Sequence, residues 1–327
     1  MKGAHWDRAN AGVGLSVLLL LALGRGWGPA ESAATDGKLP LRLAYFPNLT
    51  HAPALIGVGD GRYDKALPNV AISTRVVNAG PEAMQALLAG EVDLAFVGPS
   101  PAINTFIKSK GQALRIVAGA CDGGASLITR GDVSITSVRD LDGHSVAVPQ
   151  IGGTQDVSLR HFLVANGLKP RERGGTVSII PVANPDILTL FKRRQIDAAW
   201  VPEPWASRLR SEGNGKTAVD ERDVWPGGRF TTTVVVARRK FAEEHPEAVR
   251  EFVAAHAATV DWIQGHPREA QDSANRELQK LAGKPLEEKV LREAWSHLTF
   301  TTDPNPGSIT AFAQAARDAG YLKDKNT

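Results

Sequence analysis

The chain has 327 residues, of which 43% are hydrophobic and 22% charged, a composition typical of a globular protein with room for two domains. Its formal net charge of only +3, without a basic cluster interleaved with aromatic residues, argues against nucleic-acid binding. The single cysteine, Cys121, excludes an intramolecular disulfide.

The N-terminus differs in composition from the rest of the chain. Lys2 and Arg8 precede an apolar run from Ala11 to Leu23, and small residues follow in "PAESAATDG". This order predicts a signal peptide over residues 1–34, cleaved near Ala34, that directs the protein to the periplasm. The apolar run is shorter than the roughly 20 residues of a membrane span, although an uncleaved anchor remains the alternative. No cysteine follows the run, which argues against a lipid-anchored N-terminus.

The chain then alternates short apolar runs with helical patterns, which predicts an α/β fold with mostly parallel sheets and helices on both faces. The first series predicts strands at residues 41–45, 70–77, 93–98 and 113–120, with helices starting near residue 52 and at residues 81 and 99. Pro81 near the start and Gly90 just past the end frame the second of these helices.

A second series restarts the pattern. Strands are predicted within 140–150, 176–182, 196–201 and 231–239, and helices at 154–166, 184–195, 246–264, 268–281, 286–298 and 308–319. The segments Gln85 to Ala102 and Leu188 to Ala206 have the same order of features, namely a short amphipathic helix, an aspartate, an apolar strand and a proline before the next helix. This likeness indicates two similar halves.

Ligands of open α/β sheets bind beyond the carboxyl ends of the strands, where helix N-termini present free N–H groups. The candidate ligand-binding residues at these positions are Asn48, Thr50, His51, Asn78, Ser100, Pro101, Gly124, Thr154, Gln155, Asp156, Asn184, Glu203 and Trp205. Uncharged hydrogen-bond donors dominate this set. Such groups suit a small anion or zwitterion held by dipoles and hydrogen bonds.

Each candidate also has a purely structural interpretation. Ser100 and Thr154 are common helix caps, Asn48 with His51 could cap the first helix, and Asn184 before Pro185 is a frequent turn. In the segment "VPEPW", two prolines fix the backbone around Glu203, which serves either as a pocket residue or as a helix-dipole or salt-bridge partner. Trp205 suits a pocket wall, whereas Trp200 lies within a strand and is expected in the core.

Motifs of catalysis are missing from the sequence. It contains no G-x-S-x-G, H-E-x-x-H or G-x-x-x-x-G-K, and the eight histidines do not fall at metal-ligand spacings. The carboxylates of Asp156 and Glu203 are a candidate acid–base pair, but two carboxylates among so many acidic residues are a weak signal. We therefore expect a protein that is not an enzyme and uses neither a cofactor nor a metal.

Four blocks in the same order carry a family resemblance: "YFPNLTHAPALIG", "NAGPEAMQALLAGEVDLAFVGPSPAINTFIKS", "QIGGTQDVSLRHFL" and "IDAAWVPEPWASRL". They resemble the substrate-binding proteins of ABC importers of the nitrate, sulfonate and taurine type, over residues 41–321. The resemblance implies a two-lobed periplasmic binding protein fold of type II, with ligand held between lobes that close. It places the first lobe at 38–122 and 230–322, the second at 123–229 and a flexible C-terminus at 323–327.

The resemblance also implies partners. A monomeric protein would bind a small organic anion or zwitterion, such as a sulfonate or taurine, and deliver it to a permease and an ATPase. Two alternatives stay open on this fold: an enzyme or heterocycle binder similar to the pyrimidine synthases of thiamine biosynthesis, and a ligand-sensing domain for a membrane receptor.

Overall fold

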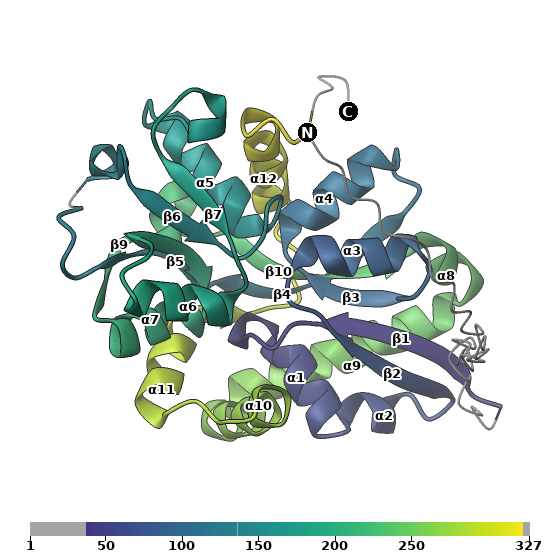
Figure 1. Ribbon diagram of the computed structural model, residues 1–327. Helices are drawn as coiled ribbons and strands as arrows, with labels where there is room; N and C mark the ends of the chain where they lie inside the picture. Colours follow the sequence, from purple (N-terminus) through teal and green to yellow (C-terminus); the bar gives the residue numbers. More distant parts are fainter. Residues whose placement is uncertain (1–36, 136, 323–327) are drawn as a thin grey trace, which may run out of the picture. The chain divides into compact units, whose positions relative to one another are not determined.

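The computed structural model describes residues 37–135 and 137–322, whose strands form two mixed sheets of six and five strands (Figure 1). The predicted signal peptide at 1–34 and the predicted flexible end at 323–327 lie outside the described residues. Helices cover both faces of each sheet, as the alternating sequence pattern predicts (Figure 1).

Sheet A, the six-stranded sheet, has the strand order β11-β4-β10-β3-β1-β2. Its strands are β1 (Leu39–Tyr45), β2 (Val70–Val76), β3 (Leu94–Val97), β4 (Leu114–Gly123), β10 (Thr231–Arg238) and β11 (Leu298–Phe300). The first three pair in parallel, as predicted. β10 runs antiparallel between β3 and β4, and its nearly continuous burial explains why its sequence is apolar or threonine at almost every position.

Sheet B, the five-stranded sheet, has the order β7-β6-β8-β5-β9. Its strands are β5 (Ala125–Arg130), β6 (Ser145–Val148), β7 (Ser178–Pro181), β8 (Ala198–Pro202) and β9 (Gly215–Asp220). β6, β7 and β8 are the predicted parallel set, and Trp200 in β8 is fully buried, as expected. The sequence did not predict β5 and β9, which run antiparallel to their neighbours in the sheet.

Most of the helices come directly after a strand along the chain. They are α1 (Ala52–Gly59), α2 (Arg62–Ala66), α3 (Gly80–Leu88), α4 (Pro99–Lys108), α5 (Thr154–Ala165), α6 (Asn184–Lys192), α7 (Trp205–Gly213), α8 (Arg239–Glu244), α9 (Pro246–Gly265), α10 (Pro267–Ala282), α11 (Glu288–Ser296) and α12 (Pro306–Asp318). The last helix packs against both α4 and α5 through a cluster of apolar side chains that includes Ile103, Val157 and Phe312.

The aspartates that the two matching sequence segments have in common make the same kind of hydrogen bond in the two sheets. Asp93, just before β3, accepts a hydrogen bond from the backbone nitrogen of Arg42 at 3.0 Å. Asp197, just before β8, accepts one from the backbone nitrogen of Ser145 at 2.9 Å. In each sheet the aspartate therefore fixes an interior strand to its parallel neighbour, at the middle of β1 in sheet A and at the start of β6 in sheet B.

The chain passes from sheet A to sheet B through Gly123 and Gly124. Both have left-handed backbone angles, with φ of +77° and +73°. A Cβ on Gly124 would lie 2.2 Å from Leu298 Cδ2, and one on Gly123 would lie 2.7 Å from the carbonyl oxygen of His297. Both positions therefore require glycine. Gly124, a candidate ligand residue, serves this link and does not line the pocket described below.

Candidate functional site

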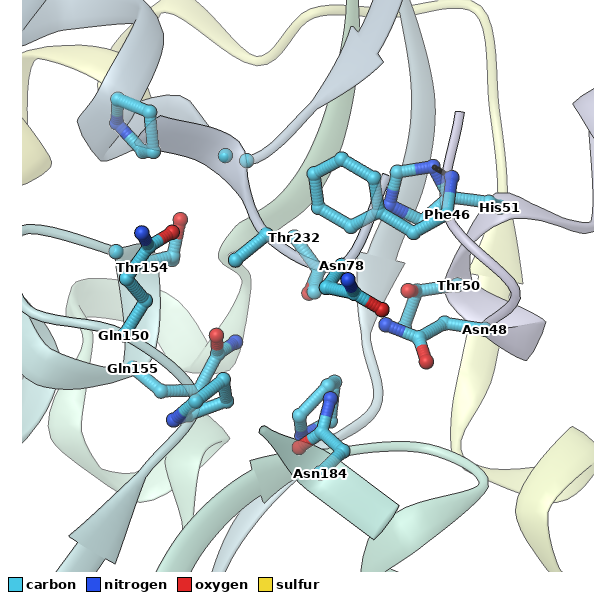
Figure 2. Close-up of a pocket in the computed structure, with 17 residues that line it drawn as sticks. Phe46, Asn48, Thr50, His51, Asn78, Gln150, Thr154, Gln155, Asn184 and Thr232 are labelled. Carbon is cyan, nitrogen blue, oxygen red and sulfur yellow. Dashed lines mark hydrogen bonds between the residues drawn. The ribbon is translucent and has the colours of Figure 1, made fainter. Parts of the chain in front are cut away.

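A pocket lies where the strand ends of the two sheets meet (Figure 2). Its empty volume, counted together with the open mouth, is about 440 Å³. It is lined by Phe46, Asn48, Thr50, His51, Asn78, Ala79, Gly80, Gly98, Pro101, Pro149, Gln150, Gly153, Thr154, Gln155, Asn184, Pro202 and Thr232. The segment after β1 and the starts of α3 and α4 contribute from the side of sheet A. The segment after β6, the start of α6 and the end of β8 contribute from the side of sheet B.

Four helices begin at this pocket. Gly80 and Asn184 are the first residues of α3 and α6, Gly98 is the N-cap of α4, and Gly153 is the N-cap of α5. The first turn of a helix has free N–H groups and a partial positive charge, so these ends favour an anionic group. No Asp, Glu, Lys or Arg is among the lining residues. The lining can therefore attract an anion only through backbone dipoles and uncharged donors.

His51 adds no charge to the pocket. Burial lowers the pKa of its imidazole to about 3, so the ring is neutral at physiological pH. The backbone nitrogen of Phe46 donates to His51 Nδ1 at 3.4 Å, which leaves the ring proton on Nε2. The two rings are stacked, with centroids 4.2 Å apart, and form one wall (Figure 2).

Asn48 has a defined amide orientation. The indole Nε1 of Trp205, at the start of α7, donates to Asn48 Oδ1 at 2.9 Å. Because an indole nitrogen only donates, the oxygen of the amide must face Trp205. The Nδ2 group of Asn48 is then directed toward the pocket, as Figure 2 shows. This bond also joins the segment after β1 of sheet A to the helix that follows β8 of sheet B.

Several lining side chains have polar atoms without a protein partner. Thr154 Oγ1, Asn184 Oδ1 and Gln150 Oε1 are buried and make no hydrogen bond with the described residues. A Cβ on Gly98 would lie 2.1 Å from Thr154 Oγ1, so glycine lets the starts of α4 and α5 approach each other. Unpaired buried polar atoms are uncommon in folded proteins, and together at a pocket they indicate a ligand that completes their hydrogen bonds.

The structure brings together eight of the candidate residues in the pocket lining: Asn48, Thr50, His51, Asn78, Pro101, Thr154, Gln155 and Asn184. Ser100 and Thr154 are not helix caps, because Gly98 and Gly153 hold those positions. Ser100 is the second residue of α4, fully buried behind the lining, with its hydroxyl unpartnered among the described residues.

Glu203 and Asp156 have protein partners in place of pocket contacts. Glu203 is 1% exposed, pairs with Arg210 at 2.9 Å and accepts a hydrogen bond from the backbone nitrogen of Ser207 at 3.0 Å. It thus stabilises the start of α7. This is the structural role that the sequence left open for Glu203. Asp156 is fully buried and bonds the backbone nitrogen of Gly152 at 2.7 Å. Trp205 contacts the lining through Asn48 without being part of it.

Thr232 is a lining residue that the sequence did not indicate. The other lining residues are candidates or lie beside them at the predicted strand ends and helix starts. Thr232 belongs to β10, which the sequence predicted as a strand without indicating its place in the sheet. Its hydroxyl donates to the carbonyl of Gly123 in the link between the sheets. Only the insertion of β10 between β3 and β4 brings Thr232 to the pocket, and no local pattern carries that information.

Two further features of residues 37–135 and 137–322 bear on function. Their His, Cys, Asp and Glu side chains form no group of three that could hold a metal ion. Within the same residues, no helix combines the length and the apolar character needed to cross a bilayer.

A pocket between two α/β sheets, formed by helix starts at the strand ends, is the arrangement of the periplasmic binding proteins. The chain belongs to the NMT1-like family, with a match over residues 34–278. It is 30% identical over 200 residues to the taurine-binding periplasmic protein of Escherichia coli strain K12, an alignment that covers 61% of this chain and 59% of that protein. The match thus spans less than two thirds of that relative.

Solved structures confirm the predicted fold. The alkanesulfonate-binding protein SsuA from Xanthomonas axonopodis pv. citri, bound to MOPS, superposes with a TM-score of 0.72 at 18% identity, over 87% of this chain and 94% of that one. The periplasmic nitrate-binding protein NrtA from Synechocystis PCC 6803 gives a TM-score of 0.70 at 17% identity, over 88% of this chain and 83% of that one. The family resemblance drawn from the four sequence blocks is likewise confirmed.

Proposed function

We propose that this protein is the solute-binding component of an ABC importer and that it captures a small organic anion or zwitterion of the sulfonate or taurine kind. The observation that carries the proposal is the start of four helices at a pocket whose lining has no charged side chain. Such a site binds an anionic head group through backbone N–H groups and neutral donors. The names of the taurine- and alkanesulfonate-binding relatives support the same ligand class.

The placement of Glu203 strengthens the case for an anion. A carboxylate in the pocket would repel a sulfonate, but Glu203 is paired with Arg210 outside the lining. Asn48 Nδ2 is then a donor available to an anionic oxygen. The unpartnered amide oxygens of Gln150 and Asn184 can accept from an N–H group, so a zwitterion has partners for both of its ends.

The division into lobes belongs to this proposal. Lobe one comprises residues 38–122 and 230–322, and lobe two comprises residues 123–229. Ligand touches lining residues from both sheets at once, so it stabilises the state in which the lobes are closed. The bond between Asn48 and Trp205, which joins segments from the two proposed lobes, supports a closed arrangement.

The remaining parts of the proposal concern location and partners. The segment 1–34 is a cleavable signal peptide, and the mature protein acts in the periplasm as a monomer. It delivers its ligand to a permease with an ATPase and catalyses no reaction itself. The binding-protein names of the relatives support this role, and they do not favour the pyrimidine-synthase alternative.

A ligand screen tests the proposal. Thermal unfolding of the purified protein is measured with taurine, ethanesulfonate, nitrate, a phosphonate and an aminopyrimidine, followed by calorimetry for each compound that raises the melting temperature. At a ligand concentration 100 times its Kd, binding stabilises the folded state by about 2.7 kcal/mol, a shift of several degrees. We expect that shift for a sulfonate. A response to the pyrimidine alone, with conversion to a product, would contradict the proposal.

A further inference from the structure

A hydrogen-bond network at the start of α5 connects the C-terminal segment to the pocket. Asp156 is fully buried, and its Oδ2 accepts from the backbone nitrogen of Gly152 at 2.7 Å. Its Oδ1 accepts from Arg160 Nε at 2.8 Å. The hydroxyl of Tyr321, from the other end of the chain, also donates to Oδ2. One carboxylate therefore binds a loop, a helix and the C-terminal segment.

The loop in this network is part of the pocket. Gly152 lies between Gln150 and Gly153, both of which line the pocket together with Thr154. It has φ of +74°, and a Cβ placed on it would lie 3.8 Å from a ring carbon of Tyr321. The tyrosine therefore packs against the loop backbone at the same place where its hydroxyl reaches Asp156. These contacts restrain Gly152 through its N–H group and its α-carbon.

The position of Tyr321 is set by the last helix. α12 packs on α4 and α5, which both begin at the pocket, and Tyr321 follows that helix by three residues. The guanidinium of Arg160 lies 5.7 Å from the centre of the tyrosine ring and holds its face. Burial and the adjacent Asp156 raise the pKa of Tyr321, so the phenol keeps its proton and remains a donor at neutral pH.

We propose that Tyr321 and Asp156 are positioning residues for ligand binding, which hold the loop Pro149–Gly153 so that Gln150 and Thr154 face the ligand. The proposal rests on the proposed function, since it concerns the same pocket. It adds that the affinity of the pocket depends on a residue of the C-terminal segment that is absent from its lining. The unpartnered atoms Gln150 Oε1 and Thr154 Oγ1 are the groups whose placement would be lost without the network.

The variant Tyr321→Phe tests the proposal, because it removes only the hydroxyl and keeps the ring against Gly152. Arg173→Met is the matched control. Arg173 donates to the carbonyl oxygens of Asp318 and Ala319, so it holds the same C-terminal segment without touching Asp156 or Gly152. Amide hydrogen exchange is measured first, without ligand, on a peptide that contains Gly152. We expect exchange about tenfold faster in Tyr321→Phe and unchanged in Arg173→Met.

Calorimetry then gives the affinity of each variant for taurine, ethanesulfonate and nitrate. For a compound that binds the wild type, we expect about tenfold weaker binding by Tyr321→Phe and less than a twofold change in Arg173→Met. Unchanged exchange at Gly152 overturns the proposal, as does an equal loss of affinity in both variants, because that result would reflect helix docking in general. If none of the compounds binds the wild type, the proposed ligand class fails, and the exchange experiment still decides whether Tyr321 positions the loop.

Discussion

At the scale of single residues, the bond from Trp205 to Asn48 fixes which amide group faces the pocket. Asn48→Asp tests this assignment. Trp205 can still donate to one carboxylate oxygen, and the other oxygen then replaces the Nδ2 donor with a negative charge near the ligand. Two like charges at about 4 Å repel by roughly 4 kcal/mol near a protein surface. We expect calorimetry to show at least about 100-fold weaker binding of ethanesulfonate.

The matched control is Asn166→Asp, which adds the same charge at an exposed residue at the end of α5. Its affinity should equal that of the wild type. Affinity that stays within threefold of the wild type in Asn48→Asp would show that this amide does not face the ligand.

A second prediction concerns the hydroxyl of Thr154, which is buried without a partner among the described residues. Thr154→Val removes it at nearly constant shape, so ligand binding should weaken about tenfold. The free energy of unfolding without ligand should stay constant or rise by up to about 1 kcal/mol, since an unsatisfied polar atom is removed. Thr233→Val is the control, because Thr233 has the same unpartnered hydroxyl outside the pocket lining. Equal affinities of the two variants would exclude Thr154 from ligand contact.

The sequence predicted the neutral part of the lining well, because those residues follow directly from strand ends and helix starts. Asn48, Thr154 and Asn184 are examples, each placed at the pocket by local order alone. For Glu203 the sequence could not decide between a ligand contact and a structural partner, and for Asp156 it indicated only a ligand residue or one member of an acid–base pair. The packing of α12 on α5 brings Tyr321 to Asp156, whereas Arg210 lies in α7 only seven residues after Glu203.

At the scale of elements, α7 depends on Glu203. Its carboxylate accepts from the backbone of Ser207 in the first turn, and it pairs with Arg210, which also pairs with Glu293 of α11 at 2.5 Å. Glu203→Gln keeps an acceptor for the backbone and loses the ion pair within a buried site. Urea unfolding should show a loss of about 1–3 kcal/mol, while the affinity for ethanesulfonate changes less than twofold. A marked loss of affinity without a loss of stability would instead place Glu203 in ligand binding.

The sequence predicted most helices and the parallel strands to within a few residues, but not β5, β9, the short strand β11, or the short helices α2 and α8. β5 follows β4 after the single residue Gly124, so no helix or turn segment separates the two apolar runs. β9, with the sequence "GKTAVD", is a partly exposed strand at the edge of sheet B without an apolar face. Both strands run antiparallel to a neighbour, and this pairing is set by the packing of the sheet.

At the scale of the whole molecule, two buried histidines make stability depend on pH. Burial lowers the pKa of His51 to about 3 and that of His256 to about 4. In the unfolded chain both titrate near 6.5, so below that pH the unfolded state binds more protons and stability falls until the folded pKa values are reached. At pH 5 each histidine should cost about 2 kcal/mol of unfolding free energy relative to neutral pH.

His256→Asn isolates one of these contributions. The imidazole Nε2 of His256 donates to the carbonyl of Gly119 at 2.7 Å, and an asparagine amide can donate there without titrating. Urea unfolding at pH 7 and pH 5 should show a pH-dependent loss that is smaller by about 2 kcal/mol in the variant than in the wild type. The same loss in both proteins would show that the folded state accommodates a charged His256.

The insertion of β10 between β3 and β4 has a consequence for biogenesis. A nascent chain that ends before residue 231 lacks an interior strand of sheet A, so β3 and β4 have no partner to join them. The hydrophobic core of that sheet closes only after most of the polypeptide has been synthesised. For the export proposed above, such delayed closure would keep the precursor unfolded for the translocation machinery during synthesis.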